Sequence, residues 1–149
     1  MHWIQAINGQ KSLLDRGEEC MSKISCIIPC YNEQEALPYF IKEILNVADI
    51  LKKEDAELEI LFVNDGSKDN TLQLLRQASK EDERISYISF SRNFGKEAAM
   101  YAGFQHCTGD YAAVMDADMQ DPPSLLPEMY HILSGGGTTA LQPVELHAK

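Results

Sequence analysis

Basic residues are scarce in this chain. Its 149 residues include 13 Lys and Arg against 23 Asp and Glu, which gives a formal net charge of −10 at pH 7. Unaided nucleic-acid binding depends on basic patches, so the composition argues against a nucleic-acid partner. If the chain binds a ligand that carries phosphate, positive charge must come from another source.

Long apolar runs are also missing. No stretch of about 18 apolar residues occurs, so the sequence predicts no transmembrane helix within this chain. The N-terminus lacks the compact apolar region of a secretory signal. The four cysteines form no C-x-x-C pair, which argues against a zinc site and fits reduced thiols in a cytosolic compartment.

Two familiar catalytic motifs do not occur either. The sequence has no G-x-S-x-G elbow, which disfavours a serine hydrolase. The glycine triplet at 135–137 lacks the spacing of a phosphate-binding P-loop. The chemistry of this chain therefore has to be sought in other residues.

What the sequence does contain is an alternation of strand and helix patterns, at a length that predicts one domain. Apolar or alternating runs typical of strands occur at 24–28, 58–63, 85–90 and 111–115. Helices are predicted at 37–51, 70–78, 97–106 and 125–133. Asn32, with Glu35 three residues on, resembles a capping box before the first helix. We expect an α/β fold, a three-layer sandwich with a mainly parallel sheet between helices.

The two ends of the chain do not share this pattern. Residues 1–22 have no clear period, so we expect a non-core extension there and a natural start at Met21. The pattern stops after residue 133, and 134–149 is predicted to be an irregular tail, as at a truncated or frameshifted end. The domain is therefore predicted at 23–133 and is expected to be incomplete.

An acidic cluster directly follows the last predicted strand. Asp116 and Asp118 stand at i and i+2 of an extended segment, so their side chains point to the same side, and Asp121 follows. Two like charges about 4 Å apart repel by about 4 kcal/mol at an effective dielectric near 20, which favours a bound cation. Oxygen ligands suit Mg²⁺ or Mn²⁺, which often bridge to a substrate phosphate. The alternative is an exposed acidic turn, but ligands of such sheets bind at the carboxyl ends of strands.

Three more polar loops are expected at the same edge of the sheet, at 29–33, 64–70 and 91–96. Tyr31 offers an aromatic face for a base, and Glu33 can accept hydrogen bonds. Lys96 lies near the start of a predicted helix, where the dipole and free N–H groups favour anions. Taken alone, the loop at 29–33 is better explained as an ordinary turn with a helix cap, and the other two are explained equally well by turn or surface chemistry.

Together the four loops resemble glycosyltransferase family 2, whose members have the GT-A nucleotide-diphospho-sugar fold. The resemblance covers about residues 23–133, and its motifs are at 27–33, 63–71, 91–103 and 116–123. The segments 92–97 and 118–123 are most similar to the branch that acts on polyprenyl phosphates. That branch includes dolichyl-phosphate mannosyltransferases and bactoprenol glucosyltransferases.

The resemblance implies a role for each matching residue. Asp116 and Asp118 become the catalytic D-x-D pair, which faces the diphosphate and a Mg²⁺ or Mn²⁺ ion, with Gln120 as a further metal ligand. Asn64 stands where many relatives carry Asp, which leaves UDP and GDP both open. The residues implied to bind the nucleotide-sugar are Pro29, Tyr31, Glu33, Asn64, Asp65, Lys96 and Ala117.

The resemblance also implies a reaction. Family members are inverting and metal-dependent, and they use a nucleotide-diphospho-sugar linked to UDP or GDP. A lipid-phosphate acceptor is already anionic near neutral pH, so it needs no strong general base. We expect only the donor-binding half of the domain here, cytoplasmic or at the cytoplasmic face of a membrane. Missing strands would leave a free sheet edge and the risk of homo-oligomers.

Three other readings stay open at this point. The chain could bind a nucleotide-sugar without turning it over, as a fragment of a transferase. A nucleotidyltransferase would need a glycine-rich basic loop after the first strand, which 29–33 does not provide. A receiver-type signalling domain would need an acidic pair after the first strand, and that pair is absent too.

Overall fold

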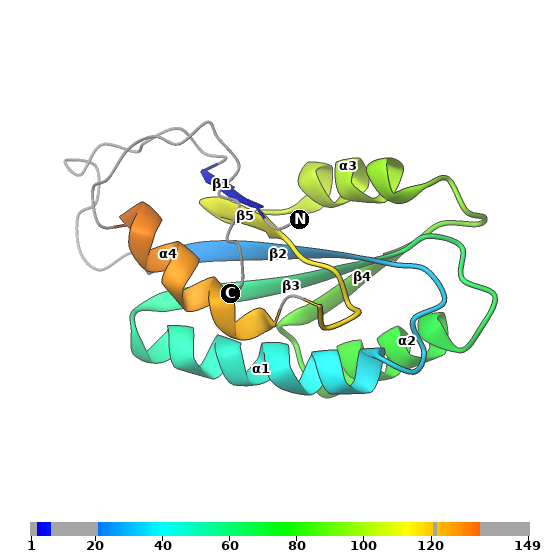
Figure 1. Cartoon of the computed structure of the whole chain (residues 1–149), viewed down its shortest axis with the longest axis horizontal. Helices are drawn as coiled ribbons and strands as arrows, with labels where there is room; N and C mark the ends of the chain where they lie inside the picture. Colours follow the sequence, from blue (N-terminus) through cyan, green and yellow to red (C-terminus); the bar gives the residue numbers. More distant parts are fainter. Residues whose placement is uncertain (1–2, 7–20, 121, 135–149) are drawn as a thin grey trace.

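A five-stranded sheet organises the part of the chain that the structure describes, in the order β1-β5-β2-β3-β4 (Figure 1). The computed structural model describes residues 3–6, 21–120 and 122–134. Neighbours among β2, β3, β4 and β5 run parallel, whereas β1 pairs antiparallel with β5. The strands are β1 (Trp3–Ala6), β2 (Ser22–Cys30), β3 (Ala56–Asn64), β4 (Ile85–Ser89) and β5 (Tyr111–Val114).

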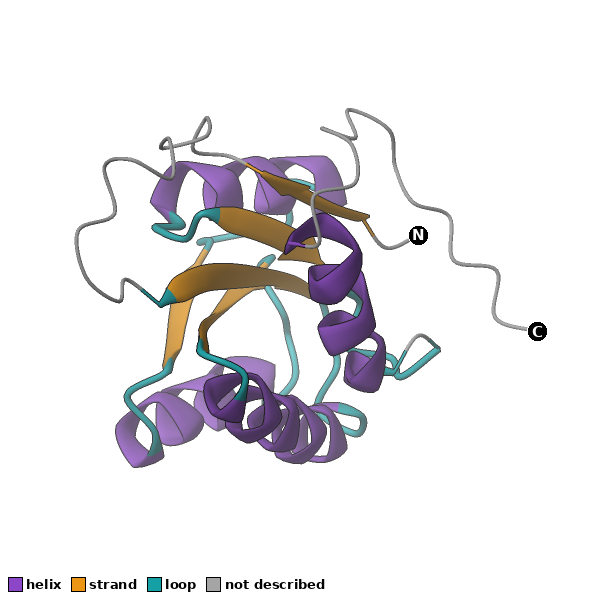
Figure 2. Ribbon diagram, turned by 90° about the vertical axis from the view of Figure 1, so that its left-hand side faces the viewer, coloured by secondary structure: helices purple, strands orange, loops and turns teal. Residues whose placement is uncertain are grey.

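Helices cover both faces of the sheet, which confirms the predicted α/β fold (Figures 1 and 2). α1, α2 and α4 lie on one face and α3 lies on the other. A short 3₁₀ turn, η1 (Pro123–Leu125), leads into α4. The helices are α1 (Leu37–Lys53), α2 (Thr71–Glu81), α3 (Lys96–His106) and α4 (Leu126–Ser134).

β2 is apolar because it is buried on both faces. Its side chains alternate between the two layers, as in any strand. Ile24 and Ile28 pack with the α1 side of the sheet, whereas Ile27 packs with Ala99 of α3. All of these are fully buried, and burying one aliphatic side chain of this size stabilises the fold by roughly 1.5–3 kcal/mol.

The register of the parallel strands brings their carboxyl ends to one edge of the sheet. Cys30 of β2 is level with Asn64 of β3, and Ile27 is level with Val114 of β5. The pairing with β5 continues for one more hydrogen bond, because Met115 N–H donates to the Ile27 carbonyl at 3.0 Å. The loops that follow these strands must therefore meet.

The predicted capping box is wrong. α1 begins at Leu37, with Ala36 in the N-cap position and no side-chain cap. Asn32 lies outside the helix with φ of 51°, and its side-chain oxygen accepts the Lys68 N–H at 2.8 Å. The Asn32 side chain, which the local pattern predicted to cap α1, instead bonds to Lys68, a residue distant in sequence.

β1 is a strand that the sequence did not predict. It comes from the segment expected to be a non-core extension, and it adds a fifth strand to the sheet. The bounds of the domain stay a prediction, and the tail at 135–149, with Cys20 and Asp121, lies outside the described residues. Within the part of the chain that the structure describes, no helix is both long and apolar enough to cross a bilayer.

Candidate functional site

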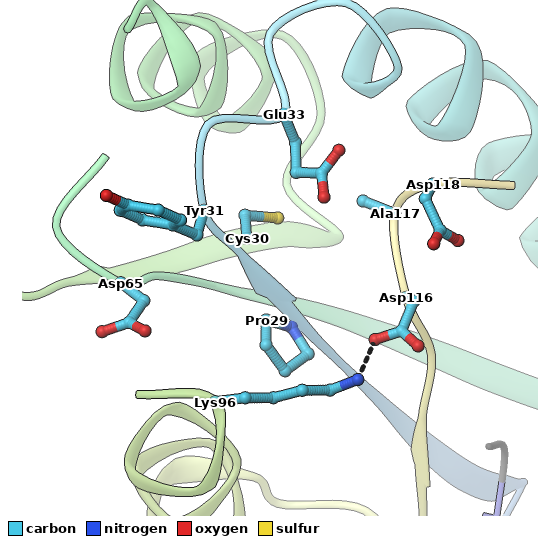
Figure 3. A pocket seen from close by; sticks show the side chains of 9 residues that line it. All are labelled: Pro29, Cys30, Tyr31, Glu33, Asp65, Lys96, Asp116, Ala117 and Asp118. Carbon is cyan, nitrogen blue, oxygen red and sulfur yellow. Dashed lines mark ion pairs between the residues drawn. The ribbon is translucent and has the colours of Figure 1, made fainter. Parts of the chain in front are cut away.

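The loops after β2, β3 and β5 and the start of α3 enclose one pocket (Figure 3). Its volume is about 230 Å³. Pockets that bury a drug-sized ligand measure roughly 300–1000 Å³, so this one surrounds part of a larger ligand and leaves the rest at the surface. The lining residues are Pro29, Cys30, Tyr31, Glu33, Asp65, Lys96, Asp116, Ala117 and Asp118.

The two ends of the pocket differ in chemistry. Tyr31 and Asp65 lie at one end, and Asp116 and Asp118 lie at the other (Figure 3). Tyr31 is 43% exposed and lines the pocket, so a ligand can reach its side chain. An aromatic ring at one end and a pair of carboxylates at the other suit a ligand with a flat base and an anionic group bridged by a cation.

The acidic end carries more negative than positive charge. Lys96 Nζ lies 2.6 Å from Asp116 Oδ1, with the two side chains 55% and 27% exposed. Burial raises the pKa of the Glu33 carboxyl, and the charges of Asp118 and Asp116 raise it further. The three carboxylates line the same pocket, so their negative charges act on whatever ligand enters it.

Asp65 fixes the loop that leads into α3, whose first residue is Lys96. Its carboxylate is 4% exposed and accepts the backbone N–H groups of Phe94 at 2.7 Å and Gly95 at 3.1 Å. The next residue, Gly66, has φ of 67°, and a Cβ there would lie 2.2 Å from the Arg92 carbonyl carbon. Only glycine allows the loop after β3 to approach this backbone so closely.

Five hydrogen bonds join the loop after β2 to the loop after β3. They tie residues 32–34 to residues 67–71, so the loop that carries Glu33 is held by the loop before α2 and by the first residue of α2. The bonds run from Asn32 N–H to Ser67 Oγ, Glu33 N–H to Thr71 Oγ1, Gln34 N–H to Asp69 Oδ2, Lys68 N–H to Asn32 Oδ1 and Asn70 N–H to Gln34 Oε1, at 2.8–3.2 Å.

Two of the predicted site residues do not line the pocket. Asn64 is 2% exposed, donates to Ser89 Oγ and accepts the Ser67 N–H. Gln120 lies beyond the acidic pair, and its N–H donates to Asp118 Oδ1 at 3.1 Å. Asp118 thus forms an acidic turn and also lines the pocket, so the two alternatives predicted for this cluster occur together.

Cys30 belongs to the buried core and also lines the pocket, a position that the sequence did not predict. Its side chain is 1% exposed, and burial, then Glu33 and Asp116, raise its pKa. The thiol therefore stays protonated and adds no charge to the pocket. Its position directly between Pro29 and Tyr31 in the motif at 29–33 was the available signal.

The donor set fits a hard divalent cation that a ligand completes. Among the described residues, no three His, Cys, Asp or Glu side chains are placed to hold a metal ion by themselves. Asp116 and Asp118 offer carboxylate oxygens at the mouth of the pocket. Mg²⁺ is usually held by one or two carboxylates, with water and substrate phosphate supplying the other ligands.

Comparison with known proteins decides the family. The family model described as glycosyl transferase family 2 matches residues 25–144. The chain belongs to this family. Two curated glycosyl transferase relatives, the prophage bactoprenol glucosyl transferase homolog of Escherichia coli (strain K12) and the bactoprenol glucosyl transferase of Shigella phage SfX, are each 39% identical to it over 119 residues.

The family 2 chain is much shorter than these relatives. The match covers 80% of this chain and 38% of each relative. Its fold is similar to that of the mannosyltransferase PcManGT from Pyrobaculum calidifontis in complex with GDP-Man and Mn²⁺ (24% identity, TM-score 0.56, 64% of this chain and 27% of that one). It is also similar to S. aureus TarS 1-349 in complex with UDP-GlcNAc (21% identity, TM-score 0.59, 76% and 31%).

Proposed function

We propose that this chain forms the sugar-donor site of a metal-dependent, inverting glycosyltransferase. The enzyme moves a sugar from a nucleotide-diphospho-sugar to an acceptor, which we propose is a polyprenyl phosphate at the cytoplasmic face of a membrane. One observation carries the proposal. The loops that follow three parallel strands place an open aromatic ring and a carboxylate pair at opposite ends of one pocket.

The nucleoside occupies the Tyr31 end in this proposal. The exposed ring of Tyr31 stacks on the base, and Asp65 closes that end of the pocket. Asn64 supports this end of the pocket without lining it, because its side chain bonds to Ser67 in the loop after β3 and to Ser89 at the end of β4. The base stays either uracil or guanine, since the two neighbours of known structure hold different nucleotides.

The diphosphate lies at the acidic end in this proposal. Asp116 and Asp118 hold the divalent cation, with Gln120 close enough in sequence to add an oxygen ligand. Bound there, Mg²⁺ or Mn²⁺ stabilises negative charge on the departing nucleoside diphosphate. Among the lining residues Lys96 carries the positive charge, and its ammonium lies at the acidic end beside Asp116.

The proposed acceptor rests on the names of the relatives and on the chemistry of a phosphate nucleophile. The relatives at 39% identity are bactoprenol glucosyl transferases by name. A phosphate acceptor is already anionic near neutral pH, so its oxygen can attack the sugar without a strong base from the protein. Attack on the side opposite the leaving diphosphate inverts the configuration of the sugar carbon.

Calorimetry tests the donor site. We expect the chain to bind UDP or GDP in the presence of Mn²⁺, and more weakly without it. Asp118→Ala should remove the metal-dependent part, because it deletes a carboxylate at the acidic end. Glu57→Ala is the matched control, since Glu57 is an exposed acid at the start of β3, away from the carboxyl ends of the strands. Failure of wild type to bind either nucleotide refutes the proposal.

Transfer of labelled sugar to a polyprenyl phosphate separates turnover from binding alone. The chain covers 38% of its relatives, so nucleotide binding without turnover is the second candidate. Radiolabelled lipid formed by this chain, and lost in Asp116→Asn, supports the transferase. Tight nucleotide binding with no labelled lipid leaves the binding function alone. NMR of the linkage formed gives the stereochemistry.

A further inference from the structure

The charge balance of the pocket is uneven. Among its nine lining residues, four are acidic and Lys96 is the one base. The Asp65 carboxylate is already satisfied in part, because it accepts two backbone N–H groups. The other three acids line the same pocket, and the charges of Asp118 and Asp116 add to burial in raising the pKa of Glu33. Lys96 thus offsets part of a surplus of negative charge.

The ion pair that Lys96 makes is easily exchanged. Its Nζ lies 2.6 Å from Asp116 Oδ1, but its side chain is 55% exposed. An exposed ion pair contributes little net free energy, because water solvates both partners when they separate. The ammonium can therefore leave Asp116 at small cost when a better arrangement of charges is offered.

A second partner for the ammonium is available in the same place. Lys96 is the first residue of α3, an 11-residue helix whose N-terminus faces the pocket. Helix N-termini favour anions through their free N–H groups and dipole. A diphosphate held between this end of α3 and the acidic pair lies within reach of the same side chain.

We propose that Lys96 is an exchangeable counter-ion of the sugar-donor site. In the ligand-free chain its ammonium neutralises Asp116. When a nucleoside diphosphate enters with a divalent cation, Lys96 yields the Asp116 oxygen to that cation and pairs with a phosphate oxygen instead. This inference rests on the proposed function, because it requires a diphosphate and a cation in the pocket.

The exchange has opposite effects on the two ligands. Without nucleotide, Lys96 competes with the cation for Asp116, so it weakens binding of the cation alone. With nucleotide, the same ammonium adds a contact to the phosphates and strengthens binding. Because coupling between two ligands is reciprocal, Lys96 makes the cation and the nucleotide favour each other's binding.

Manganese titrations without nucleotide test the first effect. Free Mn²⁺ is followed by electron paramagnetic resonance for wild type, Lys96→Met, Lys96→Arg and the control Lys42→Met, which removes an exposed charge from α1. We expect Lys96→Met to bind Mn²⁺ about tenfold more tightly than wild type, since it removes a repelling charge beside Asp116. Lys96→Arg and Lys42→Met should bind like wild type.

Nucleotide titrations at saturating Mn²⁺ test the second effect. We expect Lys96→Met to bind UDP or GDP about tenfold more weakly than wild type, and the control to match wild type. Circular dichroism confirms that each variant is folded. If Lys96→Met binds Mn²⁺ no more tightly than wild type, the exchange is wrong, while nucleotide binding by wild type still supports the donor site. If wild type binds no nucleotide with Mn²⁺, both proposals fail.

Discussion

Asp65 offers a sharp test of how the pocket is held together. Its buried carboxylate accepts the N–H groups of Phe94 at 2.7 Å and Gly95 at 3.1 Å, which lie just before α3. Asp65→Ala removes both bonds, whereas Asp65→Asn keeps one acceptor oxygen. Wild type, Asp65→Asn and Asp65→Ala therefore form a series with two, one and no bonds to the loop that leads into α3.

The size of the effect follows from those two bonds. A hydrogen bond to a charged group contributes roughly 1.5–3 kcal/mol to stability. Phe94 is exposed and Gly95 half-buried, so water can reach the freed N–H groups and the lower end of that range applies. We expect Asp65→Ala to lower the free energy of unfolding by about 3 kcal/mol and Asp65→Asn by about 1.5 kcal/mol.

Urea unfolding followed by circular dichroism measures both values. Glu57→Ala is the control, because Glu57 is an exposed acid near the amino end of β3, and it should change stability by no more than about 0.5 kcal/mol. The reasoning is refuted if Asp65→Ala costs less than about 1 kcal/mol, or if Asn and Ala destabilise equally. Either result means that the loop at 91–95 does not depend on this carboxylate.

Two further predictions concern the same framework. Gly66→Ala should lower the free energy of unfolding by at least about 2 kcal/mol, because the new Cβ would strain a left-handed backbone and lie only 2.2 Å from the Arg92 backbone. A loss under about 1 kcal/mol in urea unfolding would contradict this. Burial raises the pKa of Glu59, but hydrogen bonds from Ser25 and Thr108 outweigh burial and lower it overall, so Glu59 stabilises the fold at neutral pH and loses this effect as pH falls below about 4.5. Thermal unfolding of Glu59→Gln should therefore show a lower midpoint than wild type at pH 7 and a narrowing gap toward about pH 3; parallel curves would rule this out.

The elements that could be predicted are those marked by apolar runs or by helical spacing of apolar residues. The run at 24–28 indicated a strand buried on both faces, and β2 is that strand. The helical spacing of apolar residues in α1 and α2 was also visible, because it involves residues only three or four positions apart. Strand and helix ends differ from the predictions by a few residues at most sites, as is usual for element boundaries.

The unpredicted part depends on partners that are distant in sequence. The role of Asn32 is set by Lys68, 36 residues away, and no local motif contains that information. β1 has only four residues and exists as a strand through its pairing with β5. Asn64 could be recognised as part of a motif, but its burial against Ser89 depends on the register of β3 and β4.

The candidate site divides in the same way. The alternation of strands and helices along the chain sufficed to predict parallel strands whose following loops, with Tyr31 and Asp118, would meet, and both residues line the pocket. The ion pair between Lys96 and Asp116 was not predictable, because the sequence fixes neither the path of the loop at 91–95 nor the reach of a flexible side chain. The functional roles of these residues stay predictions for the experiments above.

β1 also changes what the sheet offers to other chains. A strand edge with free N–H and C=O groups is a template for pairing with another molecule. β1 fills that edge of β5 with residues of the same chain, and the opposite edge is β4, a strand of five residues. Assembly through β5 therefore requires Trp3–Ala6 to leave first, so the N-terminal segment acts as an intramolecular competitor for any partner strand.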